Sequence, residues 1–284
     1  MSAQPSAVEA PSGKDAAYEN FPVGSFLLPR ELRPHVAVFY AFARAIDDIA
    51  DSPTLEPDDK ILRLDGFARA LNGELQDDAR FAKAQAMRRS LSQTGIPLRH
   101  CLDLISAFKQ DAVKGRYADW ADLIDYCNRS AAPVGRFLLD LHGGHRSGYA
   151  ASDALCNALQ VLNHLQDCAQ DYRDLDRVYL PGDWLSAEGA TVGDLDRPAL
   201  TTGLRRVVDR CLDGTDALLD EAQALPGGLR SRRLAMESGA ILAIARALSG
   251  RLRRQDPLAG RVALGKAAFL WCCARGAAFT RAGA

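Results

Sequence analysis

Three polar residues at helical spacing constrain this chain more than any other feature. Asn163, Asp167 and Asp171 are spaced i, i+4 and i+8. At 3.6 residues per turn they share one face of a helix that should begin near Ser152 and end before Pro181. Two carboxylates and an amide stacked this way repel one another unless a cation lies between them, and Mg²⁺ prefers such oxygen ligands. A solvated polar face is the alternative interpretation of this stretch.

A second acidic cluster favours a bound cation over a solvated polar face. Asp47, Asp48 and Asp51 follow the apolar run 36–46 and therefore end a helix that should be buried. Buried carboxylates destabilise a fold unless each is paired or bound to a metal, and a helix C-terminus is the wrong end of the macrodipole for them. Two acidic clusters that face one another and share cations are the simplest compensation. The polar stripe of this helix consists of Tyr40, Arg44, Asp47 and Asp51.

Composition limits the class of protein. Of 284 residues, 48% are hydrophobic, as expected for a substantial core, and 35 basic residues balance 36 acidic ones, so no excess charge points to nucleic acid. The seven cysteines include no C-x-x-C pair, and most lie in expected helices, which favours a reducing cytoplasm. Residues 1–17 should be a disordered tail without the features of a signal peptide, and residues 18–284 one domain.

The C-terminal stretch is the part of the sequence that could contact a membrane. No window holds about 20 uninterrupted apolar residues, which a transmembrane helix requires. The best candidate, residues 262–279, is interrupted by Lys266 and Arg275. Its alanine, leucine and tryptophan residues could still form an apolar face. We therefore expect a cytoplasmic protein with room for a peripheral contact at the inner face of the membrane.

Residues that favour the start or the end of a helix recur along the rest of the chain. Pro34 suits the first turn of one helix, and Asp58 and Asp119 can cap two others. Pro133 and Gly135 inside a helical pattern imply a kink or the close approach of another helix. His142 and His145 are weak evidence for zinc, because a third ligand is missing. A break is expected at residues 226–228, and no rhythm of alternating strands is present. The fold class should be all-α. Helices are expected over 34–51, 58–71, 78–93, from 98 onward, from 152, over 197–224 and over 234–252.

A helical bundle with two facing acidic clusters could ionise a prenyl diphosphate. Magnesium ions would neutralise the leaving diphosphate, and an apolar central cavity would protect the carbocation, which aromatic faces attract. A di-iron carboxylate bundle uses similar parts but requires Glu-x-x-His pairs, and none is present. Candidate walls of the cavity are Phe26, Phe39, Tyr40, Phe42 and Tyr126.

These motifs, in this order, resemble the squalene/phytoene synthase family over roughly residues 18–255. The resemblance implies an isoprenoid-synthase bundle that binds Mg²⁺ through both aspartate motifs. Between Asp171 and Arg177 the chain departs from the family pattern, with one apparent extra residue in the run 174–176. The motifs are Tyr40-x-x-x-Arg44-x-x-Asp47-Asp48-x-x-Asp51, Arg116-Tyr117, Tyr126-Cys-x-x-Ser-Ala-x-Pro133-Val-Gly135 and Asn163-x-x-Gln166-Asp167-x-x-x-Asp171, followed by Arg177-x-Tyr179-Leu-Pro181.

Within the family, residues 19–25 look most like the bacterial hydroxysqualene synthase branch of the hopanoid pathway. That branch ionises presqualene diphosphate, opens its cyclopropane and lets water capture the cation, with no NADPH. Gly24 stands where condensing members commonly carry lysine, which favours this branch. The alternatives are a head-to-head prenyltransferase using farnesyl diphosphate and a non-enzymatic helical interaction protein. The expected partners are the prenyl diphosphate and, by handover, sister enzymes of the pathway.

The predicted site follows from these motifs. The expected catalytic residues are Asp47, Asp48, Asp51, Asp167, Asp171, Tyr40, Arg44 and Tyr126. The expected substrate contacts are Asn20, Ser25, Phe26, Asn163, Gln166, Arg177 and Tyr179. The expected Mg²⁺ ligands are Asp47, Asp51, Asn163, Asp167 and Asp171.

Overall fold

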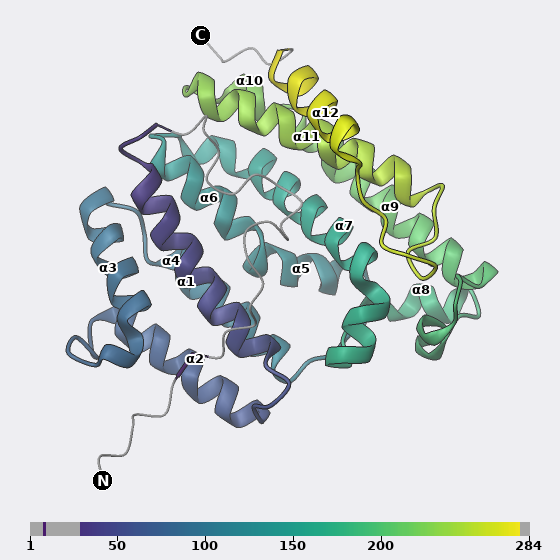
Figure 1. The fold of residues 1–284 in the computed structure, drawn as a ribbon, viewed down its shortest axis with the longest axis horizontal. Coiled ribbons are helices and arrows are strands. Elements are labelled where there is room, and N and C mark those ends of the chain that lie inside the picture. The colour runs from purple at the N-terminus through teal and green to yellow at the C-terminus, as the bar shows by residue number, and fades with distance from the viewer. Residues whose placement is uncertain (1–7, 10–28, 279–284) are drawn as a thin grey trace. The chain divides into compact units, whose positions relative to one another are not determined.

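The computed structural model describes residues 8–9 and 29–278, and the regular secondary structure of this part of the chain is almost entirely helical (Figure 1). The all-α prediction is therefore confirmed. Close contacts divide the chain into two compact units, Met1–Val113 and Lys114–Ala284. The one-domain boundary of 18–284 stays a prediction. Three predicted substrate contacts lie outside the described residues, namely Asn20, Ser25 and Phe26.

The first unit packs helix α1 against the other helices of that unit. Phe42, Phe67 and Phe81 form its aromatic core, with ring centroids 6.1 Å apart for the first pair and 5.5 Å for the second. Phe42, a candidate cavity wall, is thus a buried core residue of this unit. The elements are α1 (Arg33–Asp51), α2 (Pro57–Asn72), a 3-10 turn (Ala79–Phe81), α3 (Ala82–Thr94) and α4 (Arg99–Asp111).

Helix starts in this unit match the sequence signals with one correction. Pro34 lies in the first turn of α1, as expected. Asp58 is not the cap of α2, because the helix already begins at Pro57 and the preceding Glu56 makes no capping side-chain bond. Proline suits that first position because its missing N–H would have no helical partner, and Asp58 instead places a negative charge near the positive end of the helix.

Two residues of the predicted N-terminal tail contact this unit. The carbonyl of Val8 accepts a hydrogen bond from Arg63 Nη1 at 3.0 Å. Glu9 forms an ion pair with Lys83 at 2.5 Å. These contacts place Val8 and Glu9 on α2 and α3.

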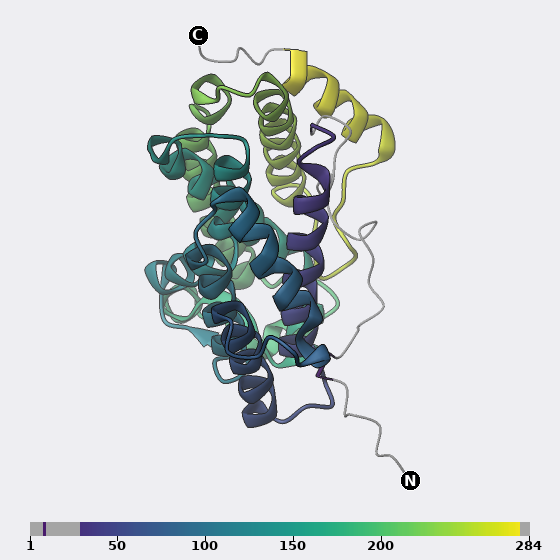
Figure 2. The ribbon, with the colours of Figure 1, turned by 90° about the vertical axis from the view of Figure 1, so that its left-hand side faces the viewer.

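The second unit is built around the long helix α7, which packs against α6, α9 and α11. Helix α12 lies along α11, as Figures 1 and 2 both show. The only strands among the described residues are two short segments that pair in parallel. The elements are β1 (Arg116–Tyr117), α5 (Trp120–Ser130), α6 (Ala132–Leu141), a 3-10 turn (Arg146–Gly148), α7 (Tyr149–Leu175), β2 (Val178–Pro181), α8 (Gly182–Ala187), a 3-10 turn (Val192–Asp196), α9 (Thr202–Ala222), α10 (Leu225–Gly228), α11 (Arg232–Leu252) and α12 (Lys266–Ala278).

Local signals in this unit were also informative. Asp119 caps α5 by accepting a hydrogen bond from the backbone N–H of Asp122 at 2.8 Å, as predicted. The chain breaks between α5 and α6 just before Pro133, and a side-chain carbon at Gly135 would collide with Ser152 of α7. The glycine therefore permits the predicted close approach of another helix. The expected break between two long helices is confirmed, since α9 ends at Ala222 and α11 begins at Arg232, but residues 226–228 themselves belong to the short helix α10, where Pro226 occupies the first turn.

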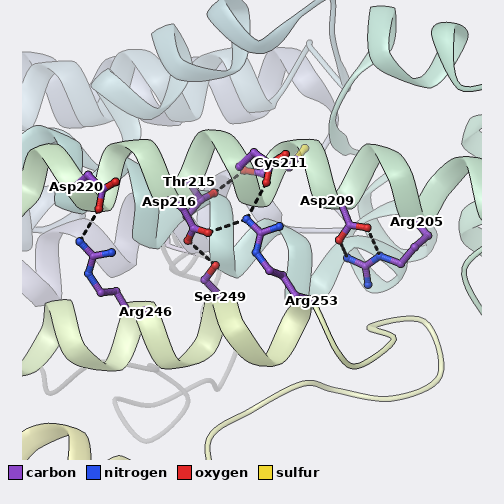
Figure 3. A network of polar contacts seen from close by, with 10 residues as sticks. Arg205, Asp209, Cys211, Thr215, Asp216, Asp220, Arg246, Ser249 and Arg253 are labelled. Atoms are coloured by element: carbon purple, nitrogen blue, oxygen red, sulfur yellow. Dashed lines mark hydrogen bonds and ion pairs between the residues drawn. The ribbon is translucent and has the colours of Figure 1, made fainter.

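A ladder of polar contacts joins α9 to α11 (Figure 3). Asp216 accepts hydrogen bonds from Ser249 Oγ and from Arg253 Nη2, each at 2.7 Å. One turn further along α9, Asp220 accepts a bond from Arg246 at 2.8 Å. Because Ser249 is only 1% exposed, its hydroxyl group needs this partner, and the pair fixes the register of the two helices.

The strand pair depends on a glycine that no larger residue can replace without movement. The Gly115 carbonyl accepts a hydrogen bond from the backbone N–H of Val178 at 2.8 Å. A side-chain carbon on Gly115 would lie 2.6 Å from the backbone oxygen of Asp176, well inside van der Waals contact. The Asp176 backbone is held in place by the hydrogen bond from its N–H to the Tyr172 carbonyl at 3.1 Å, so a shift there would strain the end of α7.

We expect Gly115→Ala to lower the free energy of unfolding by about 1–3 kcal/mol, the usual cost of overpacking a filled site. Chemical denaturation of the purified variant measures this. Gly228→Ala is the matched control, since nothing lies within 4 Å of the added carbon. Equal stability of the two variants would contradict the assigned close contact.

Candidate active site

In the first unit, one arginine forms ion pairs with two carboxylates at the end of α1. Arg44 lies 3.2 Å from Asp47 and 3.1 Å from Asp48. Asp48 is buried at 8% exposure, whereas the side chain of Asp47 keeps 31% of its accessible surface. Asp51 is half-buried at the last residue of the helix, and Tyr40 is half-buried two turns before Asp47. The predicted polar stripe is therefore present, with Asp48 on its buried side.

The electrostatics of this cluster are unfavourable for a free carboxylate. The pKa of Asp47 is raised well above its ordinary value, first by burial and then by the negative charge of Asp51. Asp48 and Asp111 raise this pKa further, and the Arg44 guanidinium lowers it. Asp47 thus lies close to three other carboxylates as well as to the Arg44 guanidinium. A divalent cation bound to Asp47 would offset the repulsion from the neighbouring carboxylates.

Asp111 was missed by the sequence interpretation. It is the last residue of α4 and is buried at 7% exposure. It lies one turn beyond Phe108, so it continues the face of α4 on which Leu104 and Ala107 are buried. An acidic residue at the end of an apolar helical stripe repeats the arrangement of α1, and that repetition was the available signal.

In the second unit, α7 presents the predicted face. Asn163, Asp167 and Asp171 are all half-buried, whereas the residues between them are buried apart from Gln170. Asp167 keeps 36% of its side-chain surface and lies 3.9 Å from Arg261. Asp171 keeps 21% and lies 3.9 Å from His164 Nδ1. Accessible oxygens at one-turn spacing can bind a cation and still leave coordination positions for water or phosphate.

The side-chain amide of Gln166 is buried and hydrogen-bonded within the protein. It is 4% exposed, and its Nε2 donates a hydrogen bond to the backbone oxygen of Val262 at 2.5 Å. This bond ties the middle of α7 to the segment before α12. The predicted substrate contact through Gln166 therefore has to compete with a buried hydrogen bond.

An aromatic cluster lies beside the acidic face of α7. The ring of Tyr179 stacks on His164, with centroids 3.5 Å apart and an interplanar angle of 12°. Tyr117 and Tyr126 complete the group, with centroids 5.5 Å and 5.6 Å from that of Tyr179. Sequence interpretation missed His164 and Tyr117 as members, although both lie inside the motifs that it quoted. Stacking on α7 is what positions the strand residue Tyr179.

The extra residue after Asp171 has a clear place in the structure. Asp176 adopts φ 50°, and its backbone N–H donates to the Tyr172 carbonyl at 3.1 Å. The next N–H, of Arg177, returns to the Asp171 carbonyl at 3.1 Å. This left-handed closure ends α7 and satisfies the carbonyls of Asp171 and Tyr172. Arg177, at 5% exposure, directly precedes β2, and Tyr179, at 8%, lies within it, so both side chains are buried.

The chemistry of these donors fits magnesium. Among the described residues, no three His, Cys, Asp or Glu side chains converge on one point. Mg²⁺ commonly uses only one or two carboxylates and fills its remaining positions with water and substrate phosphate oxygens. In the first unit Asp47 and Asp51 could hold such an ion, and in the second unit Asn163, Asp167 and Asp171 could do so.

Within the described part of the chain, no helix is both long enough and apolar enough to cross a bilayer.

Comparison with known proteins identifies the family. The sequence profile of the squalene/phytoene synthase family matches residues 15–268. This chain belongs to that family. It is therefore an enzyme of isoprenoid biosynthesis, in a family that acts on prenyl diphosphates.

Several individual members of the family are similar to this chain along most of its length. The chain is 41% identical to the hydroxysqualene synthase of Zymomonas mobilis over 261 residues, which cover 91% of this chain and 87% of that protein. It is 43% identical to the hydroxysqualene synthase of Rhodopseudomonas palustris, covering 91% and 88% of the two chains. Among solved structures, squalene synthase HpnC of Alicyclobacillus acidocaldarius is 36% identical, with a TM-score of 0.75 over 84% of this chain and 89% of that one.

Proposed function

We propose that this enzyme converts presqualene diphosphate into hydroxysqualene, a step of squalene and hopanoid biosynthesis. The observation that carries the proposal is the identity of more than 40% to hydroxysqualene synthases along nine-tenths of the chain. The reaction breaks the C–O bond with its electron pair leaving on the diphosphate. The cyclopropane of the resulting cation opens, and water adds to the cation and loses a proton to solvent. No external electron donor is consumed, so NADPH is not required.

The proposal assigns charge compensation to the two acidic clusters. Asp47 and Asp51 in the first unit, and Asn163, Asp167 and Asp171 in the second, would hold Mg²⁺. When bound, the metal supplies positive charge to the leaving diphosphate. The raised pKa of Asp47 supports this role, because burial and the neighbouring carboxylates disfavour its negative charge and a bound cation would favour it. That both clusters act on one substrate stays a prediction.

Four further predicted residues would have three roles. Arg44 would keep Asp47 and Asp48 in place, since it contacts both carboxylates. Tyr126 and Tyr179 would offer aromatic faces to the carbocation, an attraction that strengthens where water is excluded. Both tyrosines are buried in the aromatic cluster of the second unit, which keeps their rings fixed. Arg177 would bind diphosphate oxygens, to which arginine can donate two hydrogen bonds.

Product analysis tests the proposal. Purified enzyme with Mg²⁺ and without NADPH is incubated with presqualene diphosphate and, separately, with farnesyl diphosphate. We expect a C30 alcohol and released diphosphate from the first substrate only. Presqualene diphosphate, or another C30 condensation product, formed from farnesyl diphosphate would establish a prenyltransferase instead. No turnover of either substrate would favour a non-enzymatic role for the scaffold.

A further inference from the structure

The outer face of α12 combines apolar residues with basic edges. Leu270 is 66% exposed and Trp271 is 68% exposed, the largest exposed apolar side chains of the described part of the second unit. At 100° per residue they lie in the middle of one stripe, with the exposed Ala267 and Ala274 between them. The edges of the stripe carry basic residues, exposed at Lys266 on one side and Arg275 on the other.

The opposite face of α12 is fixed against its own unit. A side-chain carbon at Gly276 would collide with the backbone of Gly239 and Ala240 in α11, so the two helix backbones are in direct contact there. Phe269, Cys272 and Cys273, on the same side as Gly276, are half-buried. Because this side is occupied by α11, the stripe of Leu270 and Trp271 must point away from the unit.

Charge is distributed unevenly along the sequence. The 28 residues after Asp256 contain four basic residues and no acidic one. The remaining 256 residues contain 31 basic and 36 acidic residues. A net positive segment on a slightly negative protein is complementary to anionic surfaces. The basic residues of this segment are Arg261, Lys266, Arg275 and Arg281.

We infer that α12 docks the enzyme on an anionic lipid bilayer by lying in the plane of the headgroups. Leu270 enters the boundary of the acyl chains, and Trp271 sits at the same level with its indole N–H toward the headgroups. Lys266 and Arg275, at the two edges of the stripe, reach lipid phosphates on either side. A helix with this distribution needs no spanning length, since it buries only one face. The inference concerns a surface of the second unit and does not depend on which prenyl diphosphate the enzyme uses.

Co-sedimentation with vesicles tests the docking. The full chain is mixed with vesicles of phosphatidylcholine alone or with about one third phosphatidylglycerol at low salt. We expect binding to the anionic vesicles, a loss of about tenfold in Leu270→Ser/Trp271→Ser, and about a fivefold loss for each charge removed in Lys266→Gln and Arg275→Gln. Added salt should weaken wild-type binding as well.

Leu62→Ser is the matched control, because Leu62 on α2 is equally exposed at 69%. It should bind vesicles like the wild type, and circular dichroism should show all variants folded. Equal binding by wild type and the Leu270/Trp271 variant would overturn the proposal. So would a concentration-dependent dimer, detected by light scattering, that the same double variant abolishes, because the stripe would then cover a second copy of the chain.

Discussion

Asp167→Asn is expected to lower the rate of diphosphate release by at least about 100-fold, the usual effect of removing one charge-stabilising group from an active site. The side chain is half-exposed on α7 and keeps its size in the variant, so the fold should remain intact. An amide retains one coordinating oxygen but loses the negative charge that attracts Mg²⁺. The measurement is steady-state release of diphosphate over a range of Mg²⁺ concentrations.

A matched control lies on the same helix. Asp174→Asn makes the same chemical change at an exposed position of α7 and should change the rate less than about twofold. The Asp167 variant should also need more Mg²⁺ to reach half of its maximal rate. Full activity in Asp167→Asn with unchanged Mg²⁺ dependence would remove α7 from the metal assignment, while leaving the family membership in place.

Asp47→Asn is expected to make the protein more stable while it abolishes activity. Burial and the neighbouring carboxylates raise the pKa of Asp47, so the folded protein holds this proton more tightly than the unfolded chain. Its contribution to stability is therefore complete below the ordinary value of 3.8 and is lost as pH rises through the folded value. Asparagine carries no charge at any of these pH values. At pH 7 the variant should gain on the order of 1 kcal/mol.

Denaturation at several pH values measures the effect. The gain from Asp47→Asn should be present at pH 7 and absent below about pH 4, where both proteins are uncharged at this position. Asp77→Asn, at an exposed loop of the same unit, should leave stability unchanged at both pH values. A loss of stability in Asp47→Asn at pH 7 would mean that the Arg44 ion pair outweighs repulsion by the other aspartates.

Magnesium should reverse the order of stability. With Mg²⁺ and inorganic diphosphate, the melting temperature of the wild type should rise, because a ligand that binds only the folded state stabilises it. The Asp47 variant should respond less, since it lacks one of the proposed ligands. An equal rise in both proteins would separate Asp47 from metal binding and leave its electrostatic role untouched.

Local sequence signals predicted most of the helices. Pro34 and Asp119 marked helix starts correctly, because first-turn and capping preferences depend only on neighbouring backbone groups. The same reasoning misplaced the start of α2 by one residue and did not predict the helical turn α10 within the break between α9 and α11. In both places a proline lies in the first turn of a helix, and its position alone does not distinguish the first turn from a loop.

The acidic faces could be predicted, but the partners of their residues could not. Spacing alone places Asp167 and Asp171 on one face of α7, since helix geometry repeats every 3.6 residues. Spacing does not reveal that the Gln166 amide donates a hydrogen bond to the Val262 carbonyl, or that the charge of Asp111 raises the pKa of Asp47. Those contacts join residues far apart in the chain, and only the packing of α4 on α1 and of the C-terminal segment on α7 creates them.

The sequence by itself determined the helical class, the family and the two acidic helices, because periodicity, capping preferences and motif order depend on residues that are close together in the chain. Only the tertiary structure decided which polar groups stay available. It buries Asp48, stacks His164 on Tyr179, and turns Leu270 and Trp271 outward by seating Gly276 on α11. The physical reason is that exposure and electrostatic environment belong to the assembled surroundings of a side chain, which no local pattern contains.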